Sequence, residues 1–115
     1  MRTSYFSDCK NLADVKKRYK HQYIGVDSST AQFPRPLIYP ETARHPILTI
    51  PGRNGKKVKS SIYGCSTYSR DYFVKEIKLS KIKIGDLIIL SNAGSYCSSM
   101  FTEFLGFDKP KEIFL

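Results

Sequence analysis

Thiol and imidazole groups are the first candidates for chemistry in this sequence of 115 residues, and there are few of them. The cysteines are Cys9, Cys65 and Cys97, and the histidines are His21 and His45. An odd number of cysteines cannot all pair within the chain, and no two of them have the short spacing of a metal-binding motif. We therefore expect three reduced thiols, no metal site and a cytoplasmic location.

Positive charge is the second chemical feature. Lysine and arginine total 19 against 10 acidic residues, which gives a net charge of +9. The basic residues of segments 16–20 and 53–59, together with Tyr19 and Tyr23, could bind single-stranded nucleic acid by phosphate contact and base stacking. Because the charges are dispersed and no RNP, KH or cold-shock motif is present, a solvated basic surface is the default. We expect neither a nucleic-acid nor a membrane partner.

The elements that position these side chains belong to one small domain. The chain has a mass of 13.2 kDa, and its 41% hydrophobic and 25% charged residues are typical of a globular protein. No apolar run approaches the ~20 residues of a membrane-spanning helix. The N-terminus lacks the apolar segment of a secretion signal.

Helix is expected only at the N-terminal end. Apolar side chains recur at helical spacing within residues 7–22, with Ser7 or Asp8 as the N-cap. This pattern predicts a basic, helical N-terminal extension over residues 1–22. Five of the six prolines fall within residues 31–52, so that stretch is predicted to be extended and turning rather than helical.

The sequence pattern of the remaining residues, 23–115, is typical of β-structure. The dipeptide Asn54-Gly55 predicts a hairpin between the first two strands, and the continuous apolar run 87–90 predicts a buried central strand. Strands are expected at residues 46–50, 58–62, 73–79, 87–90 and 112–115. Several strands separated by glycine and proline turns predict a mainly all-β fold, a Greek-key-like barrel or sandwich with a short N-terminal helix.

The most specific string runs from Ile84-Gly85-Asp86 through Ala93-Gly94-Ser95-Tyr96 to Lys109-Pro110. It resembles the C-terminal β-domain of the fold-III pyridoxal-phosphate-dependent decarboxylases, which act on ornithine, diaminopimelate, arginine and related amino acids. Earlier segments match that family in the same order, namely Ile24–Asp27, Arg35–Tyr39 and Ser60–Gly64. The resemblance covers about residues 23–115 and implies a role in lysine or polyamine biosynthesis.

In this family an α/β barrel carries the lysine that binds pyridoxal 5'-phosphate, and the β-domain closes an active site formed at a dimer interface. A barrel takes ~250 residues, so the catalytic α/β barrel is absent from these 115 residues. The resemblance therefore implies a barrel subunit as partner, or self-association through the active-site face. It also implies that the isolated chain neither holds the cofactor nor acts as an enzyme.

The resemblance assigns roles to individual residues. Tyr96 matches a tyrosine that contacts the cofactor phosphate, and Arg35 and Tyr39 match a pair that holds a substrate carboxylate in the diaminopimelate branch. These pairings suit the side chains, because a phenol can donate to phosphate and a guanidinium can bind a carboxylate with two hydrogen bonds. Two positions depart from the family. Thr67 stands in place of the catalytic cysteine, and Tyr68 in place of an acid that meets the distal amine of a basic substrate.

These departures leave alternatives open. Cys65 would share a face with Thr67 if the segment is extended, which makes it a possible substitute for the missing thiol. Threonine cannot replace a thiol as a proton donor at neutral pH, so a catalytically degenerate binding or regulatory module of the same fold is the alternative to a decarboxylase β-domain. A basic nucleic-acid-binding β-barrel is the third hypothesis. The retained Arg35, Tyr39 and Tyr96 favour the first.

Overall fold

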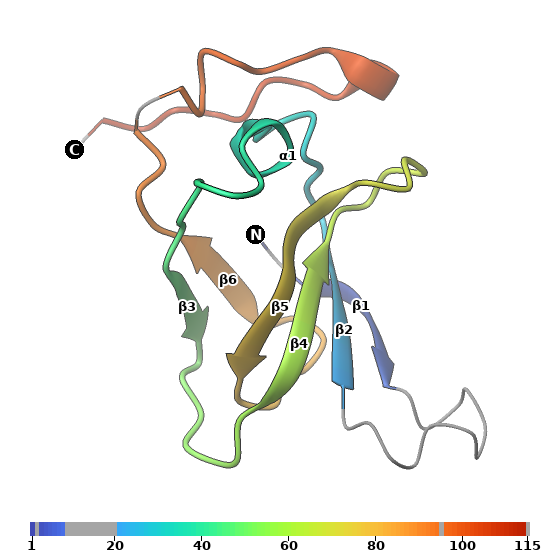
Figure 1. The fold of residues 1–115 in the computed structure, drawn as a ribbon, viewed down its shortest axis with the longest axis vertical. Helices are drawn as coiled ribbons and strands as arrows, with labels where there is room; N and C mark the ends of the chain where they lie inside the picture. The colour runs from blue at the N-terminus through green and yellow to red at the C-terminus, as the bar shows by residue number, and fades with distance from the viewer. Residues whose placement is uncertain (2, 9–20, 95, 115) are drawn as a thin grey trace.

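The computed structural model describes residues 1, 3–8, 21–94 and 96–114, and residues 3–8 by their backbone. The described chain forms a four-stranded and a two-stranded sheet (Figure 1). The larger sheet contains β1 (Thr3–Asp8), β2 (His21–Val26), β4 (Val58–Tyr63) and β5 (Tyr72–Leu79), in that order. Strands β2 and β4 run parallel, and the other neighbours are antiparallel. The smaller sheet pairs β3 (Ile47–Ile50) with β6 (Leu87–Leu90) in antiparallel orientation.

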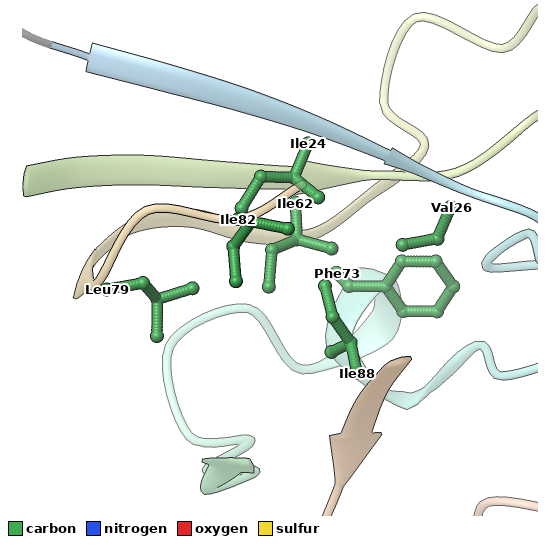
Figure 2. Close-up of a cluster of buried hydrophobic side chains, with 7 residues drawn as sticks. All are labelled: Ile24, Val26, Ile62, Phe73, Leu79, Ile82 and Ile88. Carbon is green, nitrogen blue, oxygen red and sulfur yellow. The ribbon is translucent and has the colours of Figure 1, made fainter. Parts of the chain in front are cut away.

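A cluster of apolar side chains fills the space between the two sheets (Figure 2). Ile24 and Ile62 of the larger sheet and Ile88 of β6 have no exposed surface. The full cluster is Ile24, Val26, Ile62, Phe73, Leu79, Ile82 and Ile88. Burying a side chain of this size stabilises a fold by roughly 1.5–3 kcal/mol, so the core accounts for the cohesion of the two sheets. The architecture confirms the prediction of a mainly β domain.

The prediction of a helix within residues 7–22 falls largely on residues 9–20, which lie outside the described residues. Its two ends are wrong, because Ser7 and Asp8 belong to β1 and His21 belongs to β2. The two strands pair antiparallel, and this ladder gives Ser7, Asp8 and Gln22 the backbone of strands. No helix in the described part of the chain has the length and apolar character of a membrane span.

The proline-rich stretch 31–52 contains one helical turn, α1 (Arg35–Ile38), where the sequence predicted none. Pro34 and Pro36 fall at its start, where a helix needs no N–H donor from them. The N–H of Ile38 donates to the Pro34 carbonyl at 3.0 Å and closes the turn. The prolines therefore begin the helix instead of preventing it.

The predicted hairpin across Asn54-Gly55 is also wrong. Strand β3 pairs with β6, while β4 pairs with β2 and β5, so the chain crosses from one sheet to the other between β3 and β4. Both strands carry apolar side chains that face the same core from opposite sides, and a hairpin would place them in one layer. The Arg53 guanidinium binds the carboxylate of Asp86, which directs the crossing segment toward the loop before β6.

Strand β6 is not the buried central strand that its apolar run predicted. Ile88 is fully buried, but Leu87 and Ile89 are each 41% exposed on the opposite face. An apolar run does not distinguish a strand covered on both faces from a strand whose outer face is apolar and uncovered. The last predicted strand is wrong as well, because residues 112–114 form no strand and Phe114 is 90% exposed.

Candidate functional site

Three segments that carry the predicted site residues lie at one end of the molecule, the upper end of Figure 1. They are α1, the loop of residues 64–71 between β4 and β5, and the segment of residues 91–110 after β6. Backbone hydrogen bonds fasten them to the turn that leads into α1. The N–H of Cys65 donates to the Ser28 carbonyl at 2.9 Å, and the N–H of Thr102 donates to the Ala31 carbonyl at 3.0 Å.

A buried carboxylate organises the loop of residues 64–71. Asp71 is 3% exposed and accepts two hydrogen bonds of 2.7 Å from the N–H and hydroxyl of Thr30. It accepts two more, of 3.0 and 2.5 Å, from the N–H and hydroxyl of Ser66. Gly64 lies against this carboxyl group, and a Cβ at that position would overlap it. Asp71 therefore joins the loop of residues 64–71 to the segment that leads into α1. In this way it connects two of the three segments of the candidate site.

The ionisation of Asp71 gives the first testable prediction. Burial would raise the pKa of this carboxyl, but hydrogen bonds from Ser66 and Thr30 outweigh burial and hold the pKa below its usual value. An unfolded aspartate titrates near ~3.9. The resulting stabilisation is therefore full above that pH and is lost as the pH falls through the lower folded pKa.

We expect the free energy of unfolding of the wild type to fall more steeply below about pH 5 than that of Asp71→Asn. Urea unfolding at a series of pH values measures both slopes. Parallel curves for the two proteins would contradict the role of the ionised carboxylate.

The loop presents Cys65, Thr67 and Tyr68 with exposed side chains. The backbone bends at residues 65–67 instead of continuing β4, so the extended geometry that would put Cys65 and Thr67 on one face is not present. Partial desolvation raises the pKa of the Cys65 thiol, and the Asp71 and Asp27 carboxylates add to the shift. The thiol is therefore protonated at neutral pH.

Arg35 and Tyr39 bracket the single turn of α1. The N–H of Tyr39 donates to the Arg35 carbonyl at 2.9 Å, which fixes the i, i+4 spacing of a helix between them. Residues at this spacing lie on the same helix face. Tyr39 is 46% exposed, and Arg35 is half-buried. The helical turn that the sequence did not predict thus places the backbones of these two residues one turn apart.

Tyr96 lies in the segment after β6 with an unusual backbone. Its φ of 57° is in the left-handed region, which non-glycine residues seldom adopt, and its ring is 65% exposed. A Cβ at nearby Gly94 would meet open space. A phenol donor beside an open, small-residue segment fits the phosphate of pyridoxal 5'-phosphate. Among the described residues, no group of three or more His, Cys, Asp or Glu could hold a metal ion.

Two residues at this end were not singled out from the sequence. Phe104, in the 3-10 helix η3 (Phe104–Gly106), packs edge-on against Tyr68 with 5.8 Å between ring centroids. Gly64 accommodates the Asp71 carboxyl. A glycine beside a strand often marks close approach by another group. The sequence therefore contained an indication of the role of Gly64 and none of the role of Phe104. The roles assigned to Arg35, Tyr39, Cys65, Thr67, Tyr68 and Tyr96 stay predictions, because their placement does not test them.

The basic residues around 53–59 lie at the opposite end, and part of their charge is neutralised. The Arg53 guanidinium binds Asp86 with a bond of 3.0 Å from Nη2 to Oδ1. Hydrogen bonding from Arg53 lowers the pKa of Asp86. The Lys59 ammonium lies 3.2 Å from the Glu76 carboxylate. These pairs leave fewer unpaired basic groups for a nucleic acid at this end than the composition alone indicates.

The fold agrees with comparisons to known proteins. A family model described as the C-terminal sheet domain of pyridoxal-dependent decarboxylases matches residues 9–94. Because this match covers well over half of the chain, the chain belongs to that family of sheet domains. The resemblance inferred from the sequence is therefore confirmed.

Individual relatives are diaminopimelate decarboxylases. The chain is 29% identical to the Helicobacter pylori enzyme over 101 residues, which is 87% of this chain and 24% of that enzyme. It is 26% identical to the Methanothermobacter thermautotrophicus enzyme over 99 residues, 86% of this chain and 23% of that enzyme. The chain thus spans about a quarter of the length of these curated relatives.

Solved structures give the same result at the level of the fold. The Helicobacter pylori diaminopimelate decarboxylase complexed with L-lysine superposes with a TM-score of 0.70 at 25% identity, over 90% of this chain and 23% of that chain. The lysine/ornithine decarboxylase of Vibrio vulnificus complexed with cadaverine has a TM-score of 0.73 at 24% identity, over 94% and 27% of the two chains. At that identity the second likeness concerns the fold.

Proposed function

We propose that this chain is the β-domain of a pyridoxal-phosphate-dependent amino-acid decarboxylase and completes an active site whose larger part lies on an α/β barrel. The barrel belongs either to the same longer polypeptide or to a separate subunit, and we refer to it as the cognate barrel. The observation that carries the proposal is the common location of α1, the 64–71 loop and Tyr96 at one end of the domain. That end offers donors for a carboxylate and a phosphate but contains only part of a binding site.

Each side chain has a limited task in this proposal. The cofactor supplies the electron-withdrawing group that decarboxylation needs. Tyr96 donates a hydrogen bond to its phosphate, and the exposed ring and left-handed backbone of this residue direct the phenol away from the domain core. Arg35 at the start of α1 and Tyr39 at its C-cap orient a distal substrate carboxylate. Thr67 and Tyr68 line the same region without supplying a thiol or a carboxylate.

The diaminopimelate branch fits these residues best among the substrates of the family. Diaminopimelate carries a carboxylate beside its distal ammonium, and a guanidinium can bind that carboxylate, whereas ornithine and lysine carry only the distal ammonium. The curated relatives named above are diaminopimelate decarboxylases. The alternative function, a catalytically degenerate binding or regulatory module, is favoured by one observation, the absence of a thiol at Thr67.

Reconstitution tests the proposal. The isolated chain, incubated with pyridoxal 5'-phosphate and diaminopimelate, should release no product above background. The complex with the cognate barrel should release lysine, detected by mass spectrometry. Tyr96→Phe should raise the concentration of cofactor needed for half-maximal activity at least about tenfold, because one charge-assisted hydrogen bond to phosphate contributes roughly 1.5–3 kcal/mol.

Tyr23→Phe, which removes a phenol from the other end of the domain, is the matched control and should change nothing. Activity of the isolated chain would overturn the proposed dependence on a barrel. A stable but inactive complex would instead favour the degenerate module.

A further inference from the structure

The outer face of the β3–β6 sheet is apolar and exposed. Leu48 and Ile50 of β3 are 58% and 49% exposed, and Leu87 and Ile89 of β6 are each 41% exposed. The register pairs Leu48 with Ile89 and Ile50 with Leu87, so the four side chains form two adjacent cross-strand pairs. We call these four residues the outer patch.

The outer patch is unusual for a sheet of this size. The other face of the same two strands packs on the core through Ile47, Ile88 and Leu90. An antiparallel sheet with one solvated face normally alternates apolar and polar residues, but here both faces are apolar. A two-stranded sheet is also marginal by itself, and in the described chain β3 has no strand partner besides β6. Such a surface is typical of a covered interface.

We propose that the outer patch is the docking surface for the cognate barrel, the part of the enzyme that this chain lacks. This inference rests on the proposed function. The chain covers 24% of its Helicobacter pylori relative, so a body about three times its size is available to cover the patch. The patch is also continuous with the candidate site. Ser91, directly after β6, donates its N–H to the Pro46 carbonyl at 2.9 Å and accepts a bond of 3.0 Å from His45 Nδ1.

That continuity gives the docking a geometric consequence. Strand β6 leads from the outer patch into the segment that bears Tyr96, and β3 follows the segment that begins at α1 (Figure 1). A barrel seated on the patch therefore lies next to two of the three segments that present site residues, α1 and the segment that bears Tyr96. The outer patch supplies apolar contact, and the candidate site supplies the polar groups, which matches the division of an interface into a hydrophobic centre and polar positions near it.

The test compares the double variant Leu48→Thr/Ile89→Thr with the wild type. Threonine keeps a high strand propensity, and both side chains are about half-exposed, so the fold should persist by circular dichroism. Calorimetric titration with the cognate barrel should give a Kd at least about tenfold higher for the variant. The control Lys78→Thr introduces the same residue at an exposed position of β5 in the other sheet and should bind as the wild type does.

The outcomes separate this inference from the proposed function. If the wild type does not bind the barrel at all, the proposed function fails. If the wild type and the double variant bind equally, the proposed function stands and the assignment of the outer patch is wrong. If sedimentation shows that the variant loses self-association while barrel binding is unchanged, the patch binds a second copy and the proposal is overturned. The single variant Leu48→Thr decides the same question should the double variant unfold.

Discussion

The substitution Asp71→Ala is expected to lower the free energy of unfolding by about 3 kcal/mol, because it leaves two buried and two partly buried hydrogen-bond donors without their acceptor. The donors are the N–H and hydroxyl groups of Thr30 and Ser66. For a domain of this size, the loss corresponds to a decrease in Tm of more than about 10 °C. Asp108→Ala removes a carboxylate from an exposed residue and should change Tm little. Equal Tm values for Asp71→Ala and the wild type would show that the hydrogen bonds to Asp71 do not stabilise the fold.

Gly64 allows a sharper form of the same experiment. Gly64→Ala places a methyl group on the Asp71 carboxyl, so it should destabilise the fold by about 2 kcal/mol through overlap and displaced hydrogen bonds. In the Asp71→Ala background the nearest atoms of that overlap are gone, and the same change should cost much less. Thermal unfolding of the four proteins measures this coupling. Additive effects would mean that the loss at Gly64 has a cause other than the carboxyl.

Local patterns predicted strands well and their partners poorly. The alternation in residues 73–79 and the apolar runs at 47–50 and 87–90 gave strands at the observed places, because side-chain periodicity reports local backbone geometry. The pairing of β3 with β6 and of β2 with β4 joins residues far apart in sequence. Such pairing depends on which faces share a core, and the strong local turn signal at Asn54-Gly55 does not contain that information.

The candidate site shows the same division between chemistry and position. The resemblance to the family implied that Arg35 and Tyr39 act together, and a helical turn that proline content argued against places them one turn apart. The expectation that Cys65 and Thr67 share a face is wrong, because the backbone bends at residues 65–67 instead of continuing as an extended strand. Those bends depend on the Asp71 network, in which Thr30 and Ser66 contact Asp71 across 41 and 5 residues. Spacing along the sequence cannot reveal contacts of that kind.

Substrate selectivity is the second large effect that we expect. The complex with the cognate barrel should use diaminopimelate in preference to ornithine and lysine by at least about a hundredfold in kcat/KM. The distal ammonium of ornithine or lysine needs a carboxylate from the protein, since an unpaired buried charge costs several kcal/mol, whereas the distal ammonium of diaminopimelate has the substrate's own carboxylate beside it. At the family position of that acid, this chain has Tyr68, whose ring packs against Phe104. The domain therefore presents an aromatic surface where the amine-forming branch presents a negative charge.

Tyr68→Glu should restore that charge and raise kcat/KM for ornithine or lysine about tenfold or more. Tyr68→Gln is the control, because glutamine has the shape of glutamate without its charge, and it should not raise kcat/KM. Thr67→Cys should raise kcat for every substrate, because a thiol can deliver a proton to the reacting carbon and a hydroxyl of much higher pKa cannot. Steady-state kinetics on a panel of diaminopimelate, lysine and ornithine separates the two effects, since the first is specific to substrate and the second is not. Efficient turnover of ornithine or lysine by the parent complex, unchanged by either substitution, would mean that the charge and the thiol are supplied by the barrel.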